Sequence, residues 1–220
     1  MYAPMTFTTT ADNTSPSGVA PLIGLNRHRL ASDGKGVTTL VAFHGCPLRC
    51  AYCLNRRCQE PNGVWRELTT DELLSEVMVD HLYFLATGGG ICFGGGEPCL
   101  RSNFICEFAD KMPSEWRITI ETSLNVDNKL VEQLFPKVSQ WVVDVKDMNP
   151  EIYCKYTGSD NHLVVENLEW LKRQHSEEGN IVLRLPHIPG YNTAEDIEKS
   201  RQCLLQMGFT VFDDFEYTIF

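Results

Sequence analysis

The sequence has no long apolar run and no excess of basic residues. No hydrophobic stretch approaches the roughly 18 residues that a membrane span requires, and the first residues lack the basic and apolar regions of a secretory signal. The 29 acidic residues outnumber the 19 lysines and arginines, and the net charge of −10 argues against nucleic acid, which needs a surplus of basic groups. These absences predict a cytoplasmic protein with neither a membrane nor a nucleic acid as its partner.

The composition is otherwise that of an ordinary folded protein. Hydrophobic residues make up 43% and charged residues 22% of the sequence, which argues against a disordered or coiled-coil chain. The 220 residues are enough to bury one sizeable core. We expect residues 1–20, rich in Thr, Ser and Pro, to be a flexible tail and residues 21–220 to form one core domain.

Short apolar segments of β type alternate with amphipathic helical segments along the domain. The expected strands are residues 38–44, 90–93, 117–121, 141–145, 181–185 and 209–212, and the expected helices are 69–78, 103–111, 129–134, 163–174 and 193–207. This alternation predicts an α/β fold with a parallel sheet. Six such units predict a partial (β/α)6, TIM-like barrel that is open on one side, because eight units need about 250 residues. Functional groups are then expected at the carboxyl ends of the strands.

Nine cysteines in a chain without a secretory signal favour metal binding over disulfides. Cys46, Cys50 and Cys53 form a CxxxCxxC motif on one loop after the first expected strand. Three thiolates can hold a [4Fe–4S] cluster and leave one iron open for a substrate or cofactor. Cys58 leaves two alternatives open, a closed four-cysteine cluster and a zinc site. The remaining five cysteines are scattered, as is typical of small buried hydrophobic residues.

The segment CPLRCAYC resembles the radical S-adenosylmethionine (radical SAM) superfamily. The resemblance implies that the open iron chelates the methionine end of S-adenosylmethionine. It also implies that one-electron reduction then yields a 5′-deoxyadenosyl radical, so that the cofactor carries the difficult chemistry. Tyr52, directly before the third cysteine, is expected near the adenine of the cofactor, with shielding of the cluster from solvent as the alternative.

Two further segments fit this resemblance. An expected strand leads into Gly95, Gly96 and Glu97 of a sequence similar to the GGEP motif of the superfamily, whose backbone is implied to bind the cofactor's ammonium group. Asp144 and Lys146 lie at the end of another expected strand and point to one face. They either contact a zwitterionic ligand or form an ordinary surface ion pair.

The segments DVKDMNPEIYCKYTG, NHLVVENLEWL and RLPHIPGYN resemble the activating enzymes of glycyl radical enzymes, of the pyruvate formate-lyase activase type. That resemblance implies that Glu121, Thr122 and Asp144 are ligands of a monovalent cation and of the cofactor's methionyl end. Lys146 is implied to contact the cofactor's carboxylate, and Arg184 to lie near the cofactor. A glycyl radical enzyme is then the expected protein substrate, and a flavodoxin or ferredoxin-type protein the expected reductant.

Departures from the activase pattern keep other functions open. Glu121 stands where activases usually have Asp, and only Cys58 lies between the CxxxCxxC loop and Cys92, so a single cluster is expected. The sequence ends soon after residue 212, which favours a radical SAM enzyme for a small molecule or peptide, similar in size to carboxy-deazaguanine synthases. A non-catalytic iron–sulfur or zinc-binding module is the third hypothesis.

Overall fold

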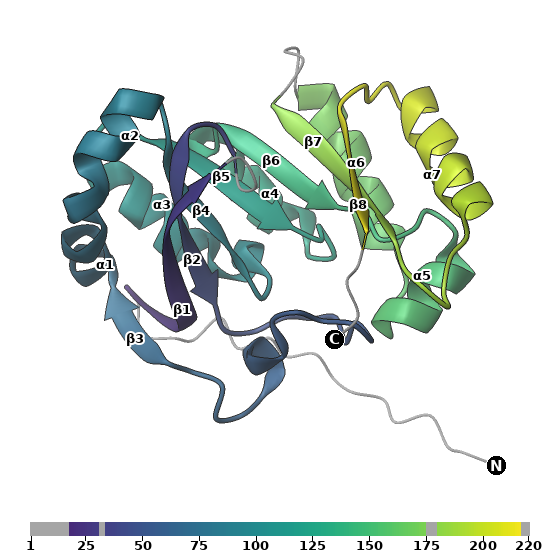
Figure 1. Ribbon diagram of the computed structural model, residues 1–220, viewed down its shortest axis with the longest axis horizontal. Coiled ribbons are helices and arrows are strands. Elements are labelled where there is room, and N and C mark those ends of the chain that lie inside the picture. The colour runs from purple at the N-terminus through teal and green to yellow at the C-terminus, as the bar shows by residue number, and fades with distance from the viewer. Residues whose placement is uncertain (1–17, 31–33, 175–179, 217–220) are drawn as a thin grey trace.

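Six parallel strands form most of the sheet in the computed structural model, which describes residues 18–30, 34–174 and 180–216 (Figure 1). They are, in spatial order, β2 (Val37–Phe43), β4 (Gly90–Gly95), β5 (Arg117–Thr122), β6 (Gln140–Asp144), β7 (Ile181–His187) and β8 (Phe212–Glu216). Figure 1 shows the sheet curving from β1 to β8 with the helices along its outer side. The predicted six-unit, open barrel is therefore confirmed.

Two antiparallel strands extend the sheet beyond β2. They are β1 (Val19–Leu30), which pairs with β2, and β3 (Arg66–Thr69), which pairs with β1. Ala20 is paired with Leu68 and completely buried. The expected tail of residues 1–20 is therefore wrong for Val19 and Ala20, which belong to the sheet, while residues 1–17 lie outside the described residues.

Seven α-helices accompany the strands. They are α1 (Thr70–Val77), α2 (His81–Thr87), α3 (Ser102–Lys111), α4 (Asn128–Leu134), α5 (Pro150–Thr157), α6 (His162–Gln174) and α7 (Ala194–Gln206) in the described part of the chain. The predicted helix over 69–78 begins with a capping box, in which Thr69 and Glu72 each accept from the other's backbone. Among the described residues, no helix has both the length and the apolar character needed to cross a membrane.

The core lies between the sheet and the helices. Phe43 of β2 stacks on Phe93 of β4 with ring centroids 5.5 Å apart, and Phe108 of α3 packs edge-on against Phe93. All three side chains are fully buried, and each stabilises the fold by about 1.5–3 kcal/mol through loss of apolar surface to water. This packing fixes the positions of the strands whose carboxyl ends carry the polar residues described below.

The last strand differs from its predicted range. Residues 209–212 were expected to be extended, but β8 begins only at Phe212. Gly208 follows α7 with a positive φ of 91°, which is typical of a residue that ends a helix. Phe209 is then buried, and the ammonium of Lys172 lies 5.6 Å from its ring centroid. An irregular segment therefore takes up residues 209–211, which the apolar pattern predicted as strand.

Candidate functional site

A cavity of about 490 Å³ opens at the carboxyl ends of the parallel strands. Every predicted site residue except Tyr52 is among the residues that line it. Arg29, Leu54 and Asp213, which the motifs did not indicate, line it as well. The volume is in the range of sites for small molecules and cofactors, about 300–1,000 Å³. The fold thus brings the cysteine motif, the glycine motif and the charged strand ends to one place.

The cysteine loop leaves β2 through Gly45, whose φ of 103° suits only glycine. Its backbone is attached to the glycine motif, because the amide of Glu97 donates to the carbonyl of Gly45 at 2.8 Å. Gly96 allows this approach, since a Cβ there would lie 2.2 Å from the carbonyl oxygen of Gly45. On its other side the loop is attached to α5, where the amide of Arg49 donates to the carbonyl of Thr157 at 2.8 Å.

Cys46, Cys50 and Cys53 present three thiols to the cavity. Hydrogen bonding to Cys58 lowers the pKa of Cys53 to about 6, whereas burial raises the pKa of Cys50 to about 12. The thiol of Cys58 is buried and hydrogen-bonds Cys46 and Cys53, which raises its own pKa far above the ordinary value. Cys58 therefore lies beside two of the three motif cysteines, Cys46 and Cys53.

The donor set suits a cluster better than a single ion. Within the described ranges, no three Cys, His, Asp or Glu side chains are placed to bind one metal ion together. A cubane cluster does not require such convergence, because each of its thiolates binds a different iron. Three thiols that line one cavity fit a [4Fe–4S] cluster, and the zinc alternative has no ligand set in the part of the chain that the structure describes.

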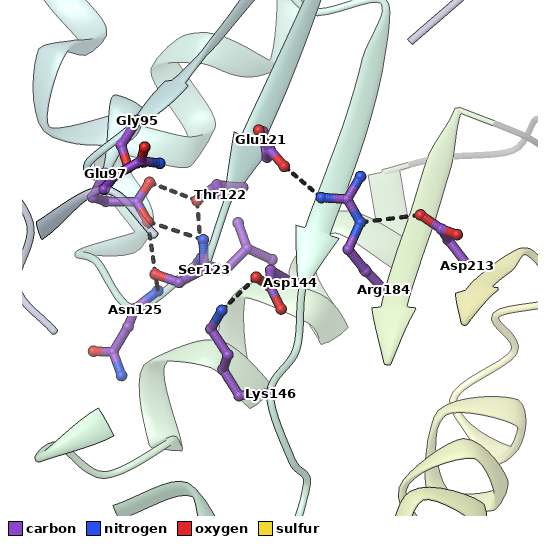
Figure 2. A network of polar contacts seen from close by, with 12 residues as sticks. Gly95, Glu97, Glu121, Thr122, Ser123, Asn125, Asp144, Lys146, Arg184 and Asp213 are labelled. Atoms are coloured by element: carbon purple, nitrogen blue, oxygen red, sulfur yellow. Dashed lines mark hydrogen bonds and ion pairs between the residues drawn. The ribbon is translucent and has the colours of Figure 1, made fainter. Parts of the chain in front are cut away.

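Glu97 joins the ends of β4 and β5 (Figure 2). One of its carboxylate oxygens accepts from the hydroxyl of Thr122 at 2.6 Å and from the amide of Cys99 at 3.2 Å. The other accepts from the amide of Ser123 at 3.0 Å and from its hydroxyl at 2.7 Å. Only 1% of Glu97 is exposed, so its carboxylate serves to position the two strand ends although the residue borders the cavity.

Charged side chains of both signs lie at the ends of β5 to β8 and pair with one another (Figure 2). Arg184 forms ion pairs with Glu121 and with Asp213, the latter at 3.0 Å from its Nε. Lys146, only 8% exposed, pairs with Asp144. Burial lowers the pKa of Arg184, but the charges of Glu121 and Asp144 outweigh it, so the net pKa is raised and the guanidinium stays protonated.

The predicted cation ligands all have protein partners. Glu121 is engaged by Arg184, Asp144 by Lys146, and the hydroxyl of Thr122 donates to Glu97. The monovalent cation therefore stays a prediction. Lys146 has a φ of 65°, which is rare for a residue with a side chain, so the turn after β6 holds this ammonium in a particular direction.

Tyr52 has a different environment from the other predicted residues. Its ring packs against Tyr156 and Tyr191, at centroid distances of 6.1 and 5.6 Å, and its hydroxyl donates to the carbonyl of Pro189 at 3.2 Å. These contacts connect the cysteine loop to α5 and to the segment after β7. Its expected place near an adenine stays a prediction.

Asp213 lines the cavity beside Arg184 but was not predicted from the sequence. It lies directly beside Arg184 in the register of β7 and β8. The expected strand ended at residue 212, one residue before Asp213, and no motif indicated this acidic residue. The pairing of the two strands, which cannot be obtained from periodicity, brings it to the cavity.

Comparison with known proteins identifies the family of the chain. The pattern of the radical SAM superfamily matches residues 40–204, and the chain belongs to that superfamily. It is 34% identical to the (2S)-3-sulfopropanediol dehydratase activating enzyme of Klebsiella oxytoca, over 82% of this chain and 74% of the relative. It is 28% identical to the pyruvate formate-lyase 1-activating enzyme of Escherichia coli (strain K12), over 74% of this chain and 66% of the relative. The chain is thus a radical SAM enzyme of the activase type.

Solved structures support the fold independently. The structure of SuiB from Streptococcus suis bound to S-adenosylmethionine superposes with a TM-score of 0.61, over 82% of this chain and 42% of SuiB. The two sequences are only 12% identical. The similarity therefore concerns the partial barrel and not the substrate.

Proposed function

We propose that this chain reductively cleaves S-adenosylmethionine and uses the resulting radical to install a glycyl radical on a partner enzyme. The observation that carries the proposal is the cavity in which the three motif cysteines face Glu121, Asp144, Lys146 and Arg184. When bound, the cluster and S-adenosylmethionine supply the one-electron chemistry and the 5′-deoxyadenosyl radical. The chain's own residues then have to hold the cofactor and exclude water.

The charges of the cavity are complementary to those of the cofactor. S-adenosylmethionine carries a carboxylate, an ammonium and a sulfonium. Lys146 is the group that would bind the carboxylate, and its partner Asp144 would face the positively charged groups. Arg184 is held between two carboxylates, so it would remain in place when the cofactor enters. The cluster would be held by Cys46, Cys50 and Cys53.

A glycyl radical enzyme as the protein substrate is supported by the similarity to the two activating enzymes. A glycine Cα of the partner would lose one hydrogen atom to the 5′-deoxyadenosyl group that the cofactor supplies, so that the unpaired electron stays on the partner and 5′-deoxyadenosine is released. The cytoplasmic location expected from the sequence is part of this proposal.

Anaerobic reconstitution tests the proposal. The protein should bind about four iron atoms and show an EPR signal of the reduced cluster that changes when S-adenosylmethionine is added. Cys46→Ser should abolish iron binding, because one of three thiolate ligands is lost. Cys58→Ser and the exposed Cys154→Ser should retain it as matched controls. Loss of the cluster in Cys58→Ser would instead support a closed four-cysteine site.

The activase step needs its own readout. Reduced protein, S-adenosylmethionine and a candidate glycyl radical enzyme should yield 5′-deoxyadenosine together with a doublet EPR signal on the partner. If 5′-deoxyadenosine forms but no glycyl radical enzyme from the same genome acquires the doublet, the cofactor chemistry stands and the activase role is refuted.

A further inference from the structure

Three arginines on the cysteine loop have no carboxylate partner among the residues that the structure describes. Arg49, Arg56 and Arg57 are all exposed, and none forms an ion pair with a described residue. Basic residues on other surfaces are commonly paired, as Arg66 is with Glu76 and Lys137 with Asp110. We call these three residues the arginine rim.

The arginine rim is held close to the cluster cysteines by the loop itself. The guanidinium of Arg49 donates to the carbonyls of Cys46 and Leu48, both at 3.3 Å. That of Arg56 donates to the carbonyl of Ala51 at 3.1 Å. Two of the three positive charges are therefore attached to the backbone of the segment that carries the motif.

The rim is a local reversal of the protein's charge. Residues 44–60 contain the three arginines but only one acid, Glu60, whereas the net charge of the chain is −10. Lys155 of α5 is exposed nearby, with its ammonium 5.5 Å from the ring centroid of Tyr191, which packs on Tyr52 of the loop. An acidic partner is thus attracted to this surface and repelled by much of the remainder.

The position of the rim indicates which kind of partner it suits. None of its arginines is among the residues that line the cavity, although Leu54 and Asn55 from the same loop are. A substrate must bring its reacting atom into the cavity. An electron donor needs only to approach the cysteine loop from outside, so the rim is placed for the donor and not for the substrate.

We infer that the arginine rim is the docking surface for an acidic one-electron carrier protein of the flavodoxin type. The inference rests on the proposed function, because only a cluster that must be reduced requires such a donor. In each encounter one electron passes to the enzyme, and the donor's flavin hydroquinone becomes the semiquinone. Redox encounters of this kind bury little area and depend on complementary charge, so we expect weak and salt-sensitive binding.

The direct test is binding of an oxidised, acidic flavodoxin to the cluster-loaded protein, measured by calorimetry over a range of salt concentrations. Removing both charges with Arg56→Gln and Arg57→Gln should weaken binding roughly tenfold or more at low salt, since one charge contact in water changes affinity by about fivefold. The dependence on salt should also become shallower. Arg117→Gln, at the opposite end of β5, is the matched control and should bind as the wild type does.

A chemical reductant separates this inference from the proposed function. With dithionite, which needs no docking surface, the double variant should cleave S-adenosylmethionine at the wild-type rate, whereas with flavodoxin it should be slower. If the wild type does not cleave S-adenosylmethionine with dithionite, the proposed function is refuted. The binding measurement would still test whether the arginine rim binds flavodoxin. The inference is overturned if the double variant binds flavodoxin as tightly as the wild type. It is also overturned if flavodoxin binding is unchanged while dithionite-driven activation of the glycyl radical enzyme falls. That second result would assign the rim to the protein substrate.

Discussion

Replacing Glu97 with glutamine should destabilise the site by leaving one buried backbone amide without an acceptor. The carboxylate of Glu97 has two donors on each oxygen, and two of these four donors are the backbone amides of Cys99 and Ser123. Glutamine has one acceptor oxygen and one NH2 group. Whichever way the amide is turned, its NH2 group faces either the amide of Cys99 or that of Ser123.

The cost follows from this count. A buried amide that loses its acceptor costs about 1–3 kcal/mol. Loss of the negative charge also weakens the two bonds that remain, because bonds to a charged acceptor are roughly twice as strong as neutral ones. We therefore expect Glu97→Gln to lower the free energy of unfolding by about 2–4 kcal/mol.

Urea unfolding of the cluster-free protein under reducing conditions measures this change. The midpoint should fall while the dependence on urea stays the same. Glu107→Gln is the matched control, because Glu107 also accepts from a threonine hydroxyl but its side chain is 42% exposed. It should change the unfolding free energy by less than about 1 kcal/mol. If Glu97→Gln is no less stable than this control, the carboxylate does not join the two strand ends as described.

Two further predictions concern other charged groups. Lys146→Met should weaken binding of S-adenosylmethionine about tenfold or more without loss of iron, because it removes a charge-assisted bond to the cofactor's carboxylate. Calorimetry and iron content measure these two effects, and an unchanged affinity would contradict the prediction. Burial raises the pKa of Asp80, but bonds from Arg27 and Thr39 outweigh it and the net pKa is lowered. Its contribution to stability is therefore complete above the unfolded-state pKa and is lost as the pH falls through the folded-state value. Acid unfolding of Asp80→Asn should show a weaker dependence on pH below about 4, and an unchanged dependence would count against this account.

The parts of the fold that sequence predicted well are those with a strong local signal. The buried parallel strands are continuous apolar runs, and the motifs that follow them had to meet at one edge of the sheet. The helix α5 was not predicted, because its apolar residues form only a weakly amphipathic pattern. Its boundaries depend on Asn149 as N-cap and Gly158 as C-cap. Likewise the pairing of β1 with β2 has two irregularities in its register, so the alternation of β1 is interrupted.

Most of the polar residues that line the cavity could be named from the sequence, but the contacts between them could not. Because their motifs follow successive strands, Glu97, Asp144 and Lys146 were expected at one edge of the sheet, and all three line the cavity. Periodicity could not show that the carboxylate of Glu97 is committed to β5, or that Glu121 is committed to Arg184. The ion pair of Asp144 and Lys146 forms, yet β6 ends at Asp144 and Lys146 reaches its partner from a left-handed turn. Such connections depend on side-chain contacts between strands that lie far apart in the sequence.

The attachment of the cysteine loop to α5 has a consequence for the order of assembly. The amides of Arg49 and Ala51 donate to the carbonyls of Thr157 and Tyr156, which are synthesised more than 100 residues later. The loop therefore acquires its shape only after the middle of the chain has emerged and folded, since contacts between distant segments form late. During synthesis the cysteine loop would not yet have the shape that binds an iron–sulfur cluster. Insertion of the cluster should therefore be post-translational and should follow the docking of α5.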